Sequence, residues 1–253
     1  MIVESFAVDG PADLDVSVPA GSLVIDPGPP GSVIVEVDTS RPDNWHVGQS
    51  GNYIWVHHEQ WSLGRSGRAR VRIVAPPGSS LNARVASADV RISVRLDRVN
   101  VTAASGDVEI GETSNLSVKT ASGDVRIVSV EKDLEVRSAS ADVTVGPVGG
   151  SASITSASGD VTIESAGGPL TVTTASGDLR IRRYEGEELQ ASTMSGTLRV
   201  GLPAGRTVKL DAKTLSGSVR LPERRPSTGA TSMSVALRLK SVSGDIVIDR
   251  LEP

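Results

Sequence analysis

The sequence predicts an all-β protein that folds as a parallel β-solenoid (β-helix), with short strands wound into stacked coils and no significant helix. Three observations lead to this prediction: a turn motif that recurs at nearly constant spacing, aliphatic columns that appear when the repeats are aligned, and a composition with 26 glycines but only 2% aromatic residues. A core without large rings must be built from Val, Ile, Leu and Ala, which suits thin, regular layers.

The repeat is a four-residue turn that reads Ser, then Gly or Ala, then in most copies Asp, then an aliphatic residue. Its copies begin at Ser87, Ser105, Ser122, Ser140, Ser158, Ser176, Ser195, Ser216 and Ser243. The steps between them are 18, 17, 18, 18, 18, 19, 21 and 27 residues. We therefore predict coils of about 18 residues, and we attribute the longer steps to loop insertions.

Aliphatic residues recur six and four residues before each turn serine, as at Leu134 and Val136, and again after the turn, as at Val143 and Val145. This alternation predicts strands with one buried face. Neighbouring coils stacked about 4.8 Å apart would share one core. An antiparallel sandwich is the alternative, since short, evenly spaced strands suit it too, but the constancy of the columns favours the solenoid. We expect right-handed winding, because the strict hexapeptide pattern of left-handed helices is missing.

The chain is expected to form one continuous domain with two parts. Residues 1–80 are predicted to be degenerate N-terminal coils or a cap, with an aromatic-rich hairpin at 45–61, and residues 81–253 to be regular repeats. Segments rich in Gly, Pro, Ser and Arg predict surface loops at 40–52, 62–69 and 222–231.

Composition excludes several classes of function. A net charge of −4 argues against a protein that tracks nucleic-acid phosphates, and the absence of cysteine excludes disulfides and thiolate metal sites. No stretch is apolar for long enough to span a membrane. The first residues, MIVESFAVDGPADLDV, lack the pattern of a signal peptide, so we expect a cytoplasmic protein, or a cell-surface protein if a leader has been removed.

The recurrent turns resemble those of a known family. They stand here as TASGDV (120–125), TASGDL (174–179), VPAG (18–21) and LPAG (202–205). They are similar to the turns of a bacterial putative-adhesin family of unknown function with β-strand repeats. The resemblance covers nearly the whole chain and is strongest from 80 to 250. It implies a β-solenoid fold and an adhesin-like role, with no catalytic residues to carry over. The missing export signal departs from what an adhesin needs.

Most copies of the turn carry an aspartate in the third position. These aspartates are Asp89, Asp107, Asp124, Asp142, Asp160, Asp178 and Asp245. A stacked row of carboxylates could bind cations, but the nonapeptide pattern of calcium-binding coils is absent. Thr197 and Ser218 take the same position in two copies, and all three residue types offer an oxygen that accepts an N–H. We therefore predict a structural ladder that caps the turns, and no metal site.

A second column lies two residues before the turn serine and holds only Thr and Ser. It consists of Thr120, Ser138, Ser156, Thr174, Thr193 and Thr214. We expect these residues to lie on a solvated strand face, with an ice-binding or ligand-binding array as the alternative.

Segment 45–61, WHVGQSGNYIWVHHEQW, holds all three Trp and all three His of the chain. Its candidate binding residues are Trp45, His46, Tyr53, Trp55, His57 and Trp61. We interpret it as a cap or a protein interface, with stacking on sugars as an alternative. A zinc site at His46, His57 and His58 is disfavoured, because adjacent strand residues point to opposite faces.

The sequence shows no nucleophile elbow, P-loop or dinucleotide fingerprint, so we predict that the protein is not an enzyme and needs no cofactor. The leading interpretation is a structural or interaction protein, a solenoid scaffold or adhesin-like module. Alternatives are a carbohydrate-binding surface adhesin and a β-helix that polymerises end to end. The expected partners are a protein or a second copy, with a glycan possible and nucleic acid excluded.

Overall fold

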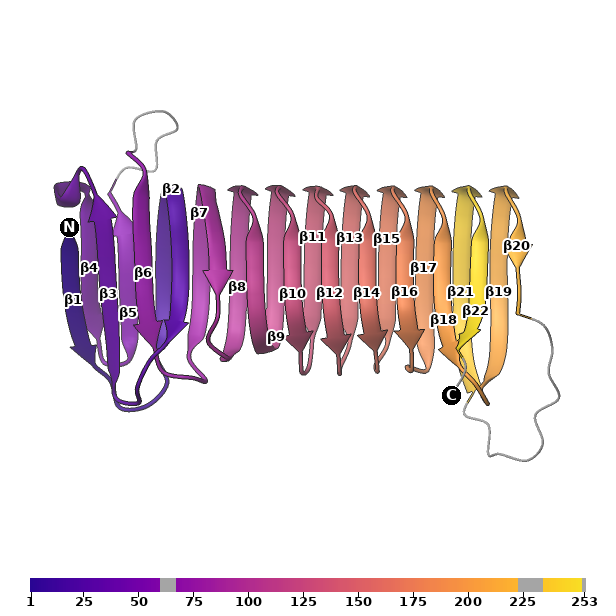
Figure 1. Cartoon of the computed structure of the whole chain (residues 1–253), viewed down its shortest axis with the longest axis horizontal. Coiled ribbons are helices and arrows are strands. Elements are labelled where there is room, and N and C mark those ends of the chain that lie inside the picture. The colour runs from indigo at the N-terminus through magenta and orange to yellow at the C-terminus, as the bar shows by residue number, and fades with distance from the viewer. Residues whose placement is uncertain (60–66, 223–233, 252–253) are drawn as a thin grey trace. The chain divides into compact units, whose positions relative to one another are not determined.

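The computed structural model describes residues 1–59, 67–222 and 234–251. The chain divides into two compact units, Met1–Val128 and Ser129–Pro253, which we call unit 1 and unit 2. In each unit short strands pair into a mostly parallel sheet (Figure 1), which confirms the all-β prediction. The described part of the chain contains one short 3-10 helix, η1, at Pro42–Asn44, and no helix there is long and apolar enough to cross a membrane.

Unit 1 begins with strands that do not follow the repeat. Its elements are β1 (Ile2–Ala7), β2 (Asp13–Pro27), β3 (Ser32–Thr39), β4 (Trp45–Ser50), β5 (Tyr53–His58), β6 (Ala69–Ala75), β7 (Ser80–Ile92), β8 (Leu96–Ser105) and β9 (Val108–Ser122). Strand β10 (Val125–Val130) crosses the boundary between the units. The loop predicted at 40–52 is wrong for its second half, because Trp45–Ser50 alternates polar and less polar residues and pairs with β5 as a strand.

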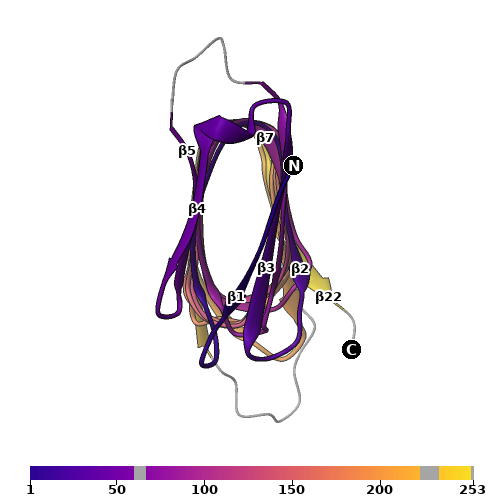
Figure 2. The same cartoon turned by 90° about the vertical axis from the view of Figure 1, so that its left-hand side faces the viewer.

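Antiparallel and parallel pairing meet in unit 1. The pairs β1–β3, β3–β6 and β4–β5 are antiparallel. Strand β2 turns a corner, so that its first part pairs in parallel with β5 and its second part with β6, while both parts pair with β7. Figure 2 shows the resulting arrangement, with β4 and β5 on one wall and β1 and β3 on the other. From β7 onward the described strand pairs of this unit are parallel.

Unit 2 consists of paired strands that follow the repeat. They are β11 (Leu134–Ser140), β12 (Val143–Val148), β13 (Ala152–Ser158), β14 (Val161–Ala166), β15 (Leu170–Ser176), β16 (Leu179–Tyr184), β17 (Glu188–Ser195), β18 (Leu198–Pro203), β19 (Thr207–Ser216), β20 (Val219–Arg220), β21 (Ser234–Ser243) and β22 (Ile246–Leu251).

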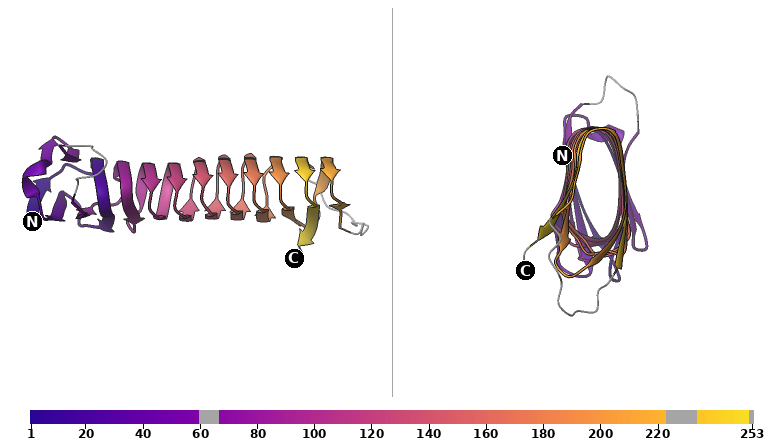
Figure 3. Two further views of the ribbon diagram at one scale, coloured as in Figure 1. Left: turned by 90° about the horizontal axis from the view of Figure 1, so that it is seen from above. Right: turned by 90° about the vertical axis from the view of Figure 1, so that its right-hand side faces the viewer.

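Each coil of unit 2 gives one strand to each of two walls (Figure 3). On the first wall Ala152 lies opposite Leu170, which lies opposite Leu189, so equivalent residues are 18 and then 19 positions apart. On the second wall Val161 pairs with Leu179 in the same way. Inward residues such as Val172 and Leu179 are fully buried. Because the described strand pairs of unit 2 are parallel, the antiparallel sandwich is excluded there.

The last two coils of unit 2 stack in the reverse of their chain order. Strand β17 pairs with β21, and β21 pairs with β19, so the coil of β21 and β22 lies between its two predecessors. The inward residues Val235, Leu237 and Leu239 of β21 are at most 1% exposed, whereas the inward residues of β19 are half-buried. The more apolar strand, β21, thus takes the position that is covered on both sides. Of the loop predicted at 222–231, residues 223–231 lie outside the described residues.

The prediction that the Thr/Ser column lies on a solvated face is wrong. Thr120, Ser156, Thr174 and Thr193 are 7%, 3%, 2% and 4% exposed. Each hydroxyl donates to the carbonyl oxygen of the turn serine two residues on, at 2.9–3.2 Å. These side chains point inward at the corner and satisfy a buried backbone acceptor there.

Candidate functional site

The turn aspartates bind the backbone of neighbouring coils. In unit 1 the Oδ1 of Asp89 accepts the N–H of Asp107, and that of Asp107 accepts the N–H of Asp124, both at 3.0 Å. In unit 2 the chain of bonds runs from Asp142 through Asp160 and Asp178 to the N–H of Thr197, at 2.8–2.9 Å. The carboxylates are thus engaged in charge-assisted hydrogen bonds between coils.

The ladder of unit 2 ends at Asp245. Its Oδ1 accepts the N–H of Ser218 at 2.8 Å and the Ser218 hydroxyl at 2.9 Å. These bonds, the backbone one first, lower the pKa of Asp245 below its ordinary value. Among residues 1–59, 67–222 and 234–251, no group of three or more His, Asp or Glu side chains is placed to hold a metal ion.

Glycine lets the turns of adjacent coils approach closely. Gly159 has φ +109°, and a Cβ built on it would lie 2.1 Å from the carbonyl oxygen of Ala141 on the preceding coil. A side chain there would be strained in its backbone and would also meet a backbone atom that is held in place.

The aromatic hairpin of unit 1, β4 and β5, divides its residues between two faces. Trp45 is 6% exposed and packs edge-on against the His58 ring, with centroids 5.2 Å apart. His46 lies opposite His57 on the other face, where it approaches Glu59 at 3.9 Å. His58 therefore lies on the opposite face of the hairpin from His46 and His57. Trp61 lies outside the described residues.

The outer face of β5 carries the other aromatic candidates beside Asp15 of β2. Tyr53 and Trp55 lie side by side, with ring centroids 5.9 Å apart and planes tilted by 34°. The Tyr53 hydroxyl donates to Oδ2 of Asp15 at 3.0 Å, and Nε2 of His57 lies 3.3 Å from the same oxygen. The bond to Asp15 raises the pKa of Tyr53.

Two further side chains reach Asp15 from β7. Asn82 donates its Nδ2 to Oδ1 at 3.0 Å, and Nη2 of Arg84 lies 3.5 Å from it. The parallel registers place Asp15 between Trp55 and Asn82. We call Asp15, Tyr53, Trp55, His57, Asn82 and Arg84 the Asp15 face.

Sequence reasoning found three members of the Asp15 face and missed Asp15, Asn82 and Arg84. The segments DLDV (13–16) and LNARV (81–85) both alternate inward aliphatic with outward polar residues. That alternation was a usable signal, but it identifies outward positions without telling which strands are neighbours. The neighbours depend on β2 pairing with both β5 and β7.

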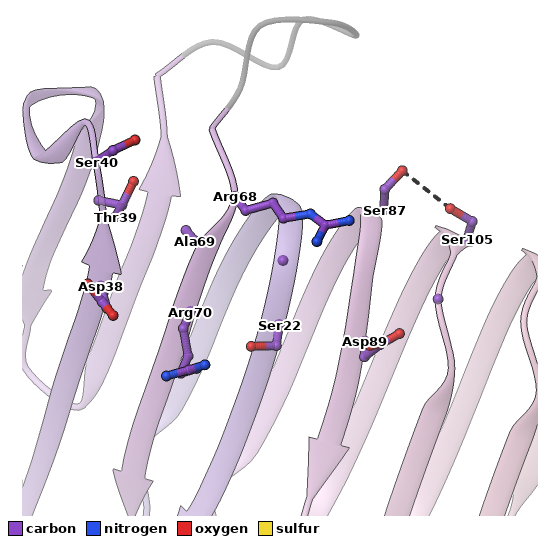
Figure 4. A pocket seen from close by; sticks show the side chains of 12 residues that line it. Ser22, Asp38, Thr39, Ser40, Arg68, Ala69, Arg70, Ser87, Asp89 and Ser105 are labelled. Carbon is purple, nitrogen blue, oxygen red and sulfur yellow. Dashed lines mark hydrogen bonds between the residues drawn. The ribbon is translucent and has the colours of Figure 1, made fainter.

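Unit 1 also has a polar pocket of about 580 Å³ at a corner of its coils, shown in Figure 4. Arg68 and Arg70 reach into it from the start of β6, with Arg68 extended toward Ser87. Ser87 and Ser105 share a hydrogen bond of 3.3 Å at its rim. Neither arginine forms an ion pair with another described residue.

The chemistry of this corner pocket is mixed. Asp38 stands opposite Arg70 in the β3–β6 register, and Asp89 also lines the pocket, so two carboxylates balance the two guanidinium groups. Hydroxyls of Ser22, Thr39 and Ser40 complete the lining. The pocket can hold a small polar molecule, but it offers no nucleophile paired with a base.

Comparison with known proteins assigns the fold to a family. The family model described as "Toastrack DUF4097" matches residues 34–249, and the chain belongs to this family. Its strand arrangement is that of a class of all-β repeat proteins, and neither the family description nor the similar structures reported below names an enzymatic activity.

Solved structures of bacterial proteins resemble the chain over nearly its whole length. One, called a putative adhesin, from Bacteroides fragilis NCTC 9343, has a TM-score of 0.51 at 13% identity and covers 99% of this chain and 96% of its own. Putative adhesins from Parabacteroides merdae ATCC 43184 and Parabacteroides distasonis ATCC 8503 have TM-scores of 0.43 and 0.37 at 11% and 10% identity. They cover 99% and 97% of this chain and each 96% of their own. A search of curated proteins found no match.

Proposed function

We propose that the protein is a non-enzymatic, adhesin-like interaction module that binds carbohydrate on the Asp15 face of unit 1. One observation supports this most strongly. Two neighbouring aromatic rings, Tyr53 and Trp55, share a strand face with the Asp15 carboxylate, which already contacts an amide and a guanidinium from β7.

This combination suits a sugar better than it suits an apolar partner. The C–H face of a pyranose packs on an aromatic ring, while its hydroxyls need planar donors and acceptors beside that ring. Tyr53 is 42% exposed and the Arg84 side chain 55%, so both are accessible, whereas Asp15 is only 14% exposed. Asp15 holds its neighbours in place, and this preorganisation reduces the entropy lost on binding.

The test is a screen of immobilised glycans with the full chain, followed by calorimetry on the best binder. Trp55→Ala and Asn82→Ala should each weaken binding about fivefold, because each removes one contact worth about 1 kcal/mol. Gln190→Ala, an exposed amide substitution in unit 2, is the control and should leave binding unchanged. If no glycan binds, or if both variants bind as wild type does, the proposal is wrong.

Self-association is a second candidate, favoured by the edge of unit 2. Within the described residues β19 pairs only with β21, and β20 only with β22, so one side of this coil offers free backbone groups. Val219 and Leu221 are 40% and 58% exposed beside that edge. An open strand edge is a template for pairing with another chain.

Light scattering after size exclusion, over a range of protein concentrations, tests this second function. Oligomers that grow with concentration and are lost in Val219→Lys would support it, with Val3→Lys in β1 as the matched exposed control. A monomer at every concentration would exclude self-association and would leave glycan binding unaffected.

The proposal also covers the handedness and length of the coils and the location of the protein in the cell. We propose right-handed coils of about 18 residues, because nearly all parallel strand connections have that hand. Glycan binding as an adhesin would require the module to lie at the cell surface, which protease treatment of intact cells would test.

A further inference from the structure

A groove of about 620 Å³ lies on the first wall of unit 2 near the turns. It lies between two columns of outward side chains that cross five neighbouring strands, β13, β15, β17, β21 and β19 in spatial order. Five strands span about 19 Å at the usual spacing, and the two columns are two residues, or about 7 Å, apart. The groove is therefore longer than it is wide.

The wall nearer the turns is apolar. It consists of the residues immediately before the turn serines, in spatial order Ala157, Ala175, Met194, Val242 and Leu215. Met194, Val242 and Leu215 are 62%, 49% and 88% exposed. Three large apolar side chains exposed in one row are unusual on a soluble surface unless they contact something.

The opposite wall is polar and becomes cationic at one end. It begins with Thr155, Thr173 and Ser192 and ends with Lys240 and Lys213, which face each other in the β19–β21 register. Like charges in register repel, which costs stability unless an anion lies between them. Lys213 approaches Asp211 at 3.3 Å, and Lys240 has no ion-pair partner within the described chain.

We propose that this groove binds a single-chain anionic amphiphile. Its acidic headgroup lies between Lys240 and Lys213, and its acyl chain runs from there along Met194, Ala175 and Ala157. The small alanines leave room for the chain, and the flexible methionine adapts to it. We propose a single molecule taken from solution as the occupant, because the two columns that border the groove are only about 7 Å apart.

Calorimetric titration of the full chain with laurate, below its micelle concentration, tests the proposal. We expect saturable binding that weakens about tenfold in Lys213→Gln/Lys240→Gln, since two exposed charge contacts are lost. Lys119→Gln is the matched control, because Lys119 stands in the equivalent column of unit 1, outside the groove, and it should bind laurate as wild type does. Ala175→Trp, which fills the groove, should abolish binding.

Two further ligands separate the alternatives. Dodecyl maltoside, with an alkyl chain of nearly the same length and no charge, should bind more weakly than laurate and equally to wild type and the double lysine variant. The immobilised protein should not retain vesicles that contain phosphatidylglycerol. Absence of saturable laurate binding, unchanged binding in the double variant or in Ala175→Trp, or binding to vesicles alone would each overturn the proposal.

Discussion

The Asp15 face of unit 1 and the groove of unit 2 are built by opposite means. In unit 1 the side chains around Asp15 are chemically unlike one another and come from β2, β5 and β7, which do not follow one repeat. In unit 2 the groove is lined by equivalent positions of successive coils, so each wall is a column of similar residues.

This difference teaches where each kind of surface can arise. A strict repeat multiplies one residue type and so makes long features with little chemical variety. Where the repeat is broken, unlike residues from different strands can meet at one point, as specific recognition of a small ligand requires. The comparison makes predictions about stability, which follow from the largest expected effect to the smallest.

Gly159→Ala should destabilise the protein by about 3 kcal/mol, because it combines backbone strain with a clash against the backbone of the preceding coil. Gly51→Ala in the β4–β5 turn should cost only about 1 kcal/mol, because its φ is +60° and no atom lies near a built Cβ. Urea unfolding followed by circular dichroism measures both. Equal losses would show that the stacked turns of unit 2 are no more constrained than a free hairpin.

Tyr184→Phe should cost about 1–2 kcal/mol, since the buried hydroxyl donates to the carbonyl oxygens of Glu188 and Gly168. Tyr53→Phe, on the exposed Asp15 face, should change stability by less than about 0.5 kcal/mol. Urea midpoints at pH 7 give both values, and a larger effect for Tyr53 would contradict the comparison.

The Tyr184 effect should also depend on pH. Burial raises the pKa of Tyr184 to about 12, while an unfolded tyrosine ionises near pH 10. The stabilisation by the neutral hydroxyl is therefore complete below about pH 10 and is lost as the pH rises toward 12. The difference in urea midpoint between wild type and Tyr184→Phe should narrow over that interval, and a constant difference would refute the assignment.

The smallest expected effect is a local loss of protection around Asp245 at acidic pH. The folded pKa of Asp245 is lowered, so its contribution is present above the unfolded pKa of about 3.9 and is lost as the pH falls below it. Amide exchange at Ser218 and Val219, corrected for intrinsic rates, should accelerate below about pH 4. In Asp245→Asn, which keeps an acceptor without the charge, this acceleration should be absent. The pKa of Asp26 in unit 1 is lowered by the hydrogen bond from Arg72. The stabilisation that Asp26 contributes should therefore also be lost as the pH falls below about 4.

The sequence predicted burial correctly wherever the position of a residue within its repeat decides that burial. Residues such as Leu170 and Val172 repeat with their coil, so their burial follows from spacing alone. Thr174 points inward like Val172, two residues before it, so its orientation also follows from alternation. Its polar side chain suggests a solvated position, but its hydroxyl instead donates to the carbonyl oxygen of Ser176.

The rest depends on which strands become neighbours. Spacing cannot reveal that β21 enters between β17 and β19, because Ser195, Ser216 and Ser243 carry the same turn and fit one another in either order. The Asp15 face has the same origin, since Asn82 and Tyr53 approach Asp15 only through the double pairing of β2. Competition among similar strands is a property of the whole fold and leaves no local signal.

The reversed order of the last two coils has a consequence for how the chain is made. A ribosome releases residues 207–222 before 234–251, yet the earlier segment needs the later one as its permanent neighbour. Until β21 is made, the edge of β17 is open, and β19 fits it in the register that β21 later takes. In the nascent protein β19 must therefore either stay unpaired or pair first with β17 and then give this place to β21. The open edge of β17 would equally fit residues 234–251 of a second copy of the chain. Two copies made side by side on one messenger RNA could therefore exchange this segment during folding.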